Sequence, residues 1–121
     1  MGISIDEFKK LTKKSGGSKY KNKKSTYNGI QFDSKKEMNR YANLLLLEKA
    51  NKISNLQLQV IYKIIINGFH VCTYIADFVY CDSDRGIVVE DVKSEHTRTL
   101  PVFRIKKKLM KAVNNIEISE Y

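Results

Sequence analysis

The stretch VVEDVKS, residues 88–94, places two acids and a lysine in a run of valines that otherwise predicts a buried strand. A second apolar run, IADFVY, carries one further acid, Asp77. If the turn between the two runs is centred on Asp84, Asp77 falls directly opposite Asp91 in an antiparallel pair. Opposed side chains lie about 5 Å apart at Cβ, and like charges there are destabilising. The sequence therefore predicts two carboxylates face to face, whose repulsion must be compensated.

Lys93 is the nearest cation to this pair. Strand alternation puts Asp91 and Lys93 on one face and Glu90 on the other. A purely structural ion cluster is one explanation, but a charge buried for stability alone is usually no better than apolar packing. Two close carboxylates suit Mg²⁺ or Mn²⁺, which prefer oxygen ligands. With a lysine to stabilise developing negative charge, the set favours metal-assisted phosphodiester hydrolysis.

The charge distribution points to a polyanionic partner. The chain has 121 residues and a formal net charge of +9, and residues 1–36 hold ten lysines against three acids. We expect DNA as the partner, although a basic surface that only improves solubility is the simpler alternative. The candidate phosphate contacts are Lys19, Lys21, Lys23 and Lys24 in a flexible arm, and Arg104, Lys107, Lys108 and Lys111 on one face of a helix.

The N-terminal part of the chain divides into an arm and the start of a domain. Residues 4–13 predict a short helix, and the glycine- and lysine-rich segment after it predicts a flexible linker. We therefore expect a basic N-terminal helix and arm over 1–26 and a single domain over 27–121. YNGIQF predicts a strand or hairpin, and the Ser34–Glu37 capping box predicts a helix that ends near Asn51.

The unbroken Leu44–Leu47 run predicts that the later turns of that helix are buried on several sides.

The rest of the domain reads as strands followed by a helix. Strands are predicted at 56–66 and 69–80 around an Asn-Gly hairpin turn, and at 87–93 after a second turn. A helix at 101–113, opened by a proline, is expected to pack through Val102, Ile105, Leu109 and Val113. IEISEY predicts a last short strand. The order indicates an α/β (α+β) fold, a mixed β-sheet flanked by helices.

Several classes are disfavoured. No apolar run approaches the length of a membrane span, and the first residues lack a signal peptide's apolar core, so we expect no membrane contact and a cytoplasmic location. Cys72 and Cys81, even with His70, do not complete a zinc site and are expected to be ordinary strand thiols.

The two acidic strands resemble the D…(D/E)-x-K signature of the PD-(D/E)XK nuclease superfamily. The span from Lys19 to Ile118 resembles a small phage-encoded family in it, described as endonuclease-like or Holliday-junction-resolvase-like. The resemblance implies a restriction-endonuclease-like fold with Asp77 and Asp91 as metal carboxylates and Lys93 as the signature lysine. Ala76 stands where many members have proline, and the triplet begins with Asp where Glu is commoner.

The resemblance also implies roles for two further residues. Glu37 matches a helical acid that many members add to the metal site, although the capping box offers its side chain a competing role. Gln59 is at a position that approaches the site in the resemblance, and an exposed polar position on a half-buried strand is the alternative.

The expected function is a Mg²⁺- or Mn²⁺-dependent DNA endonuclease. Cutting branched DNA would call for a homodimer, because two strands must be cut symmetrically. For a phage-encoded protein the expected location is the host cytoplasm. Two alternatives remain: a DNA-binding protein without catalysis, and a structural protein that uses a nuclease fold as a scaffold.

Overall fold

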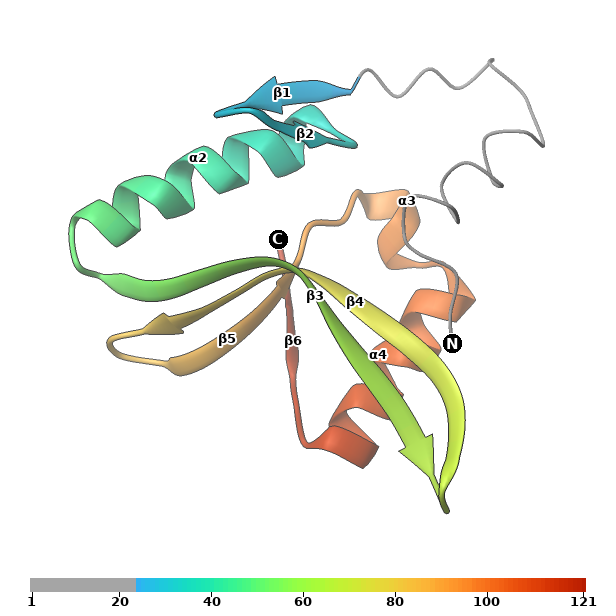
Figure 1. Cartoon of the computed structure of the whole chain (residues 1–121). Helices are drawn as coiled ribbons and strands as arrows, with labels where there is room; N and C mark the ends of the chain where they lie inside the picture. Colours follow the sequence, from blue (N-terminus) through green and yellow to red (C-terminus); the bar gives the residue numbers. More distant parts are fainter. Residues whose placement is uncertain (1–23) are drawn as a thin grey trace.

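The computed structural model describes residues 24–121, so the predicted helix at 4–13 and the predicted DNA contacts Lys19, Lys21 and Lys23 lie outside the described residues. The described part begins with a small hairpin of β1 (Ser25–Tyr27) and β2 (Ile30–Phe32) (Figure 1). Its two turn residues, Asn28 and Gly29, have φ values of 56° and 77°. Such turns match the twist of the strands and favour Asn-Gly, which confirms the hairpin.

Helix α2 (Lys35–Lys49) follows at once. Ser34 caps it by accepting a hydrogen bond from the amide of Glu37 at 3.1 Å. The C-cap is Ala50, next to the predicted end at Asn51.

Leu44 is fully buried, but Leu46 is 64% exposed. Leu45 and Leu47 are partly buried against the same core as Leu44. The later turns are therefore buried on more than one side, as predicted, but not on the side of Leu46. The helix packs on β3 and on the small hairpin.

The main sheet has four strands in the order β3-β4-β5-β6. They are β3 (Ile53–Ile66), β4 (Phe69–Asp82), β5 (Gly86–Asp91) and β6 (Ile118–Glu120). The first three are antiparallel neighbours and β6 runs parallel to β5. The predicted hairpin turn at Asn67-Gly68 is present, with φ values of 51° and 81°. This is the mixed sheet flanked by helices that the sequence predicts.

Helices α3 (Glu95–Arg98) and α4 (Pro101–Asn114) form the crossover that a parallel pair requires. Strand β5 is shorter than predicted because it ends at Asp91, but its pairing continues past that residue. The amide of Tyr121 donates to the Asp91 carbonyl at 2.9 Å, and the amide of Lys93 donates to the Tyr121 carbonyl at 3.1 Å. The backbone of Lys93 is therefore held by hydrogen bonding although this residue lies outside β5.

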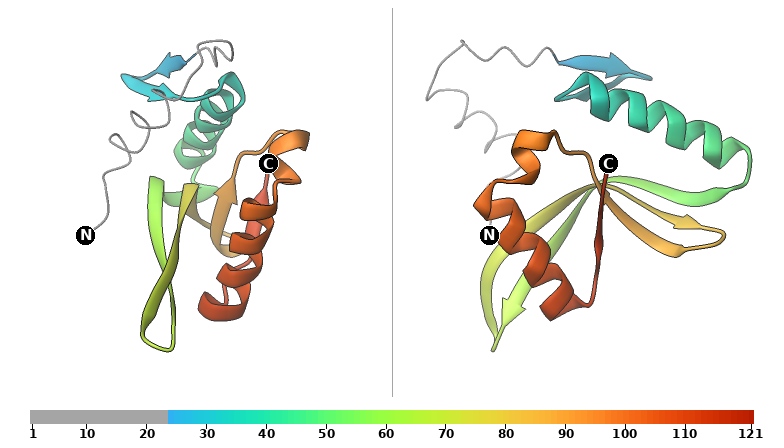
Figure 2. Two further views of the ribbon diagram at one scale, coloured as in Figure 1. Left: turned by 90° about the vertical axis from the view of Figure 1, so that its right-hand side faces the viewer. Right: turned by 180° about the vertical axis from the view of Figure 1, so that it is seen from behind.

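The sheet is strongly twisted, and a different helix covers each end (Figures 1 and 2). Towards α2, Phe78 and Tyr80 of β4 belong to one buried cluster. Towards α4, Tyr74 and Ala76 belong to a second one. Val79 packs against the second cluster, to which Ala76 belongs, although residues three apart point to opposite faces of a regular strand. The strand β4 must therefore turn between Ala76 and Phe78. The junction of the two clusters is therefore at Asp77.

Within the described residues, no helix is both long and apolar enough to cross a membrane.

The orientation of α4 differs from the prediction. Of the four residues expected to pack, Val102, Ile105 and Val113 are 65%, 57% and 37% exposed. Phe103 and Met110 are buried in their place, with Leu109 partly buried beside them. Two neighbouring stripes of α4 are apolar, and the larger side chains of one fill the space against Ile64 and Tyr74. The helix is thus rotated relative to the predicted orientation.

A buried ion pair ties α2 to β5. Arg40 donates to both carboxylate oxygens of Glu90, at 2.6 Å and 2.9 Å, and Tyr80 donates to Glu90 at 2.7 Å. The side chains of Arg40 and Glu90 are 17% and 3% exposed. The hydrogen bond to Glu90 raises the pKa of Arg40 further, so its charge is permanent. The ion pair between Arg40 and Glu90 fixes α2 over the end of β5.

We predict that Arg40→Met lowers the free energy of unfolding by about 3–5 kcal/mol, because it leaves the charge of Glu90 buried without its partner. The double variant Arg40→Met/Glu90→Leu should recover most of this loss, because both charges are then gone. Urea denaturation of the three proteins measures it. Equal losses in the single and double variants would contradict this account.

Candidate active site

The register of β4 and β5 brings the two predicted carboxylates together. Phe78 pairs with Glu90 and Val79 with Val89, as a turn centred on Asp84 requires. The ladder of paired residues ends there, and the side chains of Asp77 and Asp91 meet just beyond it. Asp91 is 3% exposed. The predicted opposition of two acids is confirmed, and it lies at the junction where β4 turns.

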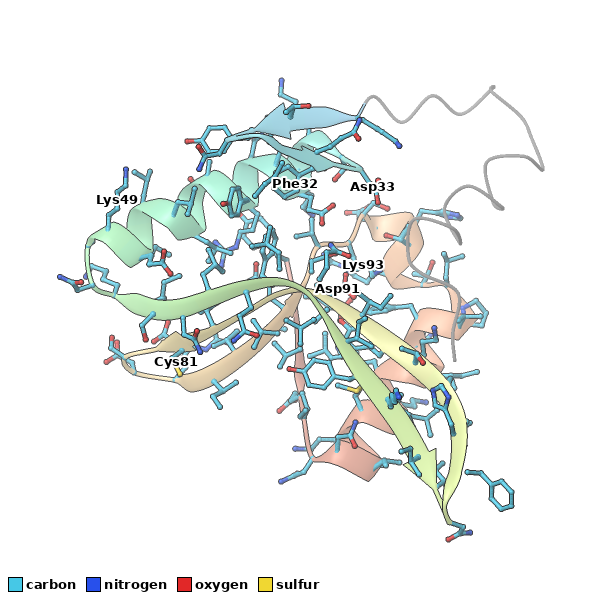
Figure 3. The ribbon with its side chains drawn as sticks, viewed as in Figure 1. Phe32, Asp33, Lys49, Cys81, Asp91 and Lys93 are labelled. Carbon is cyan, nitrogen blue, oxygen red and sulfur yellow. The ribbon has the colours of Figure 1, made fainter. Side chains whose placement is uncertain are left out.

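Lys93 lies beside this pair. Its Nζ is 3.3 Å from Asp91 Oδ1, and its side chain is 23% exposed. Figure 3 shows Asp91 and Lys93 next to each other where β5 leaves the sheet. Glu90 points away from them to Arg40, as strand alternation predicts. The lysine thus shares the face of the acids and still reaches solvent.

Each carboxylate is held by a donor from the surrounding fold. The amide of Val92 donates to Asp77 Oδ2 at 2.9 Å, and the buried hydroxyl of Tyr74 donates to Asp91 Oδ2 at 2.6 Å. Burial and the neighbouring Asp91 raise the pKa of Tyr74, which keeps the hydroxyl protonated. Tyr74 is not among the residues singled out from the sequence. The signal that could have found it is that a buried tyrosine hydroxyl usually has a hydrogen-bond partner.

Gln59 and Glu37 complete the cluster. Gln59 Nε2 lies 3.3 Å from both Glu37 Oε1 and Asp77 Oδ1 and donates to each. Gln59 has a φ of 53° and is in β3, opposite the turn of β4 at Asp77. Glu37 is 7% exposed. Its amide serves the helix cap while its carboxylate faces Gln59, so the cap and the site use different atoms of this residue.

The two acids repel one another, and burial limits their contact with water. Burial and the charge of Glu37 raise the pKa of Asp77 to about 6, against the lowering effect of hydrogen bonds from Asp91 and Val92. Burial and the charge of Asp77 raise the pKa of Asp91 to about 7, although Tyr74 and Lys93 lower it. The lysine therefore compensates for the two charges only in part.

This donor set fits a hard divalent cation. Among residues 24–121, no three His, Cys, Asp or Glu side chains form a ready-made metal cluster. Mg²⁺, however, keeps several waters and commonly uses one or two carboxylates. Asp77 and Asp91 supply those two, and a cation between them would relieve the repulsion that raises their pKa values. Glu37 is linked to Asp77 through Gln59.

The predicted strand thiols are free cysteines, and His70 is hydrogen-bonded to Thr73 at 2.8 Å.

The predicted DNA contacts on α4 differ in whether they form an ion pair. Lys107 forms an ion pair with Glu120. Arg104, Lys108 and Lys111 are exposed on α4, and none has an acidic partner within the described residues. Lys24 is exposed just before β1. Lys36, which sequence reasoning missed, donates from Nζ to the Lys93 carbonyl at 2.7 Å.

Fold and site together define a small α+β protein with an acidic pair and a lysine at the junction of two cores. Residues 17–119 match the family described as a protein of unknown function (DUF1064), so the chain belongs to this family. No curated protein and no solved structure matches it.

The raised pKa values predict a pH-dependent stability. In the folded protein both acids bind protons more tightly than at their ordinary pKa of 3.8. Their contribution to stability is present below that value and is lost as the pH rises through about 6 and 7. In EDTA, the free energy of unfolding should therefore fall between about pH 4 and pH 7 by several kcal/mol, at about 1.4 kcal/mol per pKa unit.

Asp77→Asn should flatten this decline, because it removes one charge and keeps an acceptor for the Val92 amide. Asp84→Asn, in the exposed turn between β4 and β5, is the matched control and should behave as wild type. Urea denaturation across the pH range gives the profiles. Parallel profiles for wild type and Asp77→Asn would show that the pair is not the source.

We further predict that Tyr74→Phe lowers the free energy of unfolding at pH 8 by about 1–3 kcal/mol, because it leaves a buried oxygen of Asp91 without its donor. Tyr62→Phe is the control. Tyr62 stacks on Tyr74, and its hydroxyl has no hydrogen-bond partner within residues 24–121. Equal effects of the two substitutions would mean that the hydrogen bond at Asp91 contributes nothing.

Proposed function

We propose that this protein is a metal-dependent DNA endonuclease of the PD-(D/E)XK type. The observation that carries the proposal is the pair of half-buried Asp77, within β4, and buried Asp91, at the end of the neighbouring strand β5, with Lys93 beside it. Lys93 offsets only part of the negative charge of Asp77 and Asp91. This supports a bound cation over a purely structural ion cluster. The resemblance of the two strands to the D…(D/E)-x-K signature also supports a nuclease. The same resemblance implies a restriction-endonuclease-like arrangement of the sheet.

Each residue has a role in this proposal. When bound at the carboxylates, Mg²⁺ or Mn²⁺ supplies Lewis acid chemistry that polarises a phosphoryl oxygen. Asp77 and Asp91 hold the cation, and Tyr74 and the Val92 amide fix the orientation of the two carboxylates. Lys93 stabilises the negative charge that develops on the phosphate as a water displaces the 3′ oxygen.

Lys93 is well placed for that role. Its Nζ lies 4.5 Å from the centre of the Phe103 ring, and its carbonyl accepts a hydrogen bond from Lys36. The aromatic face and the anchored backbone restrict the ammonium group to the mouth of the site. Gln59 bridges Glu37 and Asp77 and thereby positions both acids.

The proposed substrate is DNA, including branched DNA, as the resemblance to resolvases implies. Cutting two strands of a junction symmetrically calls for a homodimer. The corresponding location is the cytoplasm, or the host cytoplasm for a phage-encoded protein.

The test is cleavage of labelled four-way junction, flap, duplex and single-stranded DNA in Mg²⁺ or Mn²⁺. Wild type should cut at least one substrate, and Lys93→Ala should bind it equally well but cut it about 10²–10³ times more slowly, the usual effect of removing one charge-stabilising donor. Lys63→Ala, an exposed lysine of β3, is the control and should cut as wild type. If wild type binds DNA and cuts none of the substrates, the protein is a DNA-binding protein without catalysis. If it neither binds nor cuts, the scaffold alternative holds.

A further inference from the structure

A basic groove adjoins the candidate active site. It has a volume of about 420 Å³ and lies where α3, α4 and β6 meet. Figure 2 shows β6 next to α4, with α3 joined to the start of α4. Five cations line the groove, against only Glu117 and Glu120: Arg98, Arg104, Lys107, Lys108 and Lys111.

The five cations fall into two groups. Glu120 is shared by Arg98, at 3.5 Å, and by Lys107, so these two residues join α3 and α4 to β6 and form part of the wall. The other three, Arg104, Lys108 and Lys111, have no acidic partner within the described residues. Their charge is therefore available to a ligand.

The groove and the site of the proposed chemistry meet at the Phe103 ring. Phe103 forms part of its wall, and the same ring lies under the ammonium group of Lys93 at 4.5 Å. Arg98, on the opposite side, donates to the Lys93 carbonyl at 3.5 Å. A chain of phosphates that passes Lys93 would enter the groove directly.

The spacing of the three unpaired cations suits a nucleic-acid strand. They span seven residues of α4, or about 10 Å at about 1.5 Å per residue. A strand of B-DNA carries one phosphate per about 3.4 Å of axis. The three side chains therefore cover a length that holds about three phosphates. An isolated phosphate ion would use only one part of such an extended row.

We propose that this groove binds the phosphate backbone of the DNA strand that continues from the cleaved phosphate. Arg104, Lys108 and Lys111 contact successive phosphates, whereas Lys107 holds Glu120 and shapes the wall. These contacts set position and affinity without reading sequence. The choice of DNA as the ligand rests on the proposed function, but the binding can be tested without any cleavage.

The experiment measures binding of a labelled DNA duplex by fluorescence anisotropy in EDTA over a range of KCl concentrations. The groove variant is Arg104→Gln/Lys108→Gln/Lys111→Gln. The matched control is Lys49→Gln/Lys52→Gln/Lys63→Gln, which removes the same charge from exposed positions elsewhere. Glutamine has nearly the helix propensity of arginine and lysine, so both variants should fold, which circular dichroism checks.

The groove variant should bind at least tenfold more weakly, and the slope of log K against log salt should become shallower by about 2.7, or 0.9 for each lost phosphate contact. The control should change the slope by less than one. Equal losses in both variants, or unchanged binding by the groove variant, would overturn the proposal. Displacement of DNA by inorganic phosphate more strongly than by chloride at equal ionic strength would also overturn it, because that result indicates a pocket for a single anion.

Cleavage assays of the same variants separate this inference from the proposed function. A wild-type protein that binds through the groove and does not cut contradicts only the nuclease proposal. A groove variant that binds and cuts as wild type contradicts only the groove.

Discussion

The mutual repulsion of Asp77 and Asp91 is the constraint around which the rest of the structure is arranged. Two antiparallel strands place the carboxylates opposite each other, and burial raises the pKa of both. Hydrogen bonds from Tyr74 and the Val92 amide hold the two groups in place without cancelling their charge. The repulsion between the two acids costs free energy, and the cation proposed for this site would offset that cost.

The surrounding fold keeps this pair in position from both sides. On one face, Arg40 of α2 neutralises Glu90, the neighbour of Asp91, and locks the helix that also carries Glu37. On the other face, α4 buries Phe103, whose ring supports Lys93. The two buried clusters meet where β4 turns at Asp77. The backbone of the strand is therefore irregular at the residue whose carboxylate belongs to the candidate site. Irregular backbone at such a point is common in functional sites.

The sequence predicts the hairpins and the register well because tight turns determine them locally. Asn67-Gly68 and the turn centred on Asp84 fix which residues are opposed, and the pairing of Asp77 with Asp91 follows from the second turn. The rotation of α4 could not be predicted in this way, because two adjacent apolar stripes compete and only the three-dimensional fit of Phe103 and Met110 decides between them.

Two side-chain contacts could not be predicted for a related reason: the hydrogen bond from Tyr74 to Asp91 and the ion pair of Lys107 with Glu120. The reach of Tyr74 to Asp91 depends on the turn of β4, which breaks the period of two on which strand patterns rely. The pairing of Lys107 depends on Glu120, which comes from a strand that joins the sheet after the crossover. Long-range contacts of this kind leave no periodic signal in the sequence.

The most direct test of the central claim is a titration of the metal-free protein with Mg²⁺, followed by its thermal unfolding midpoint at constant ionic strength. Wild type should be stabilised by millimolar Mg²⁺ or Mn²⁺ and not by K⁺, because only a divalent cation relieves the repulsion between the two acids. Asp77→Asn and Asp91→Asn should lose this response while remaining folded. If wild type shows no response to either divalent cation, or if both variants respond as wild type does, the pair is not a metal site and the account is wrong.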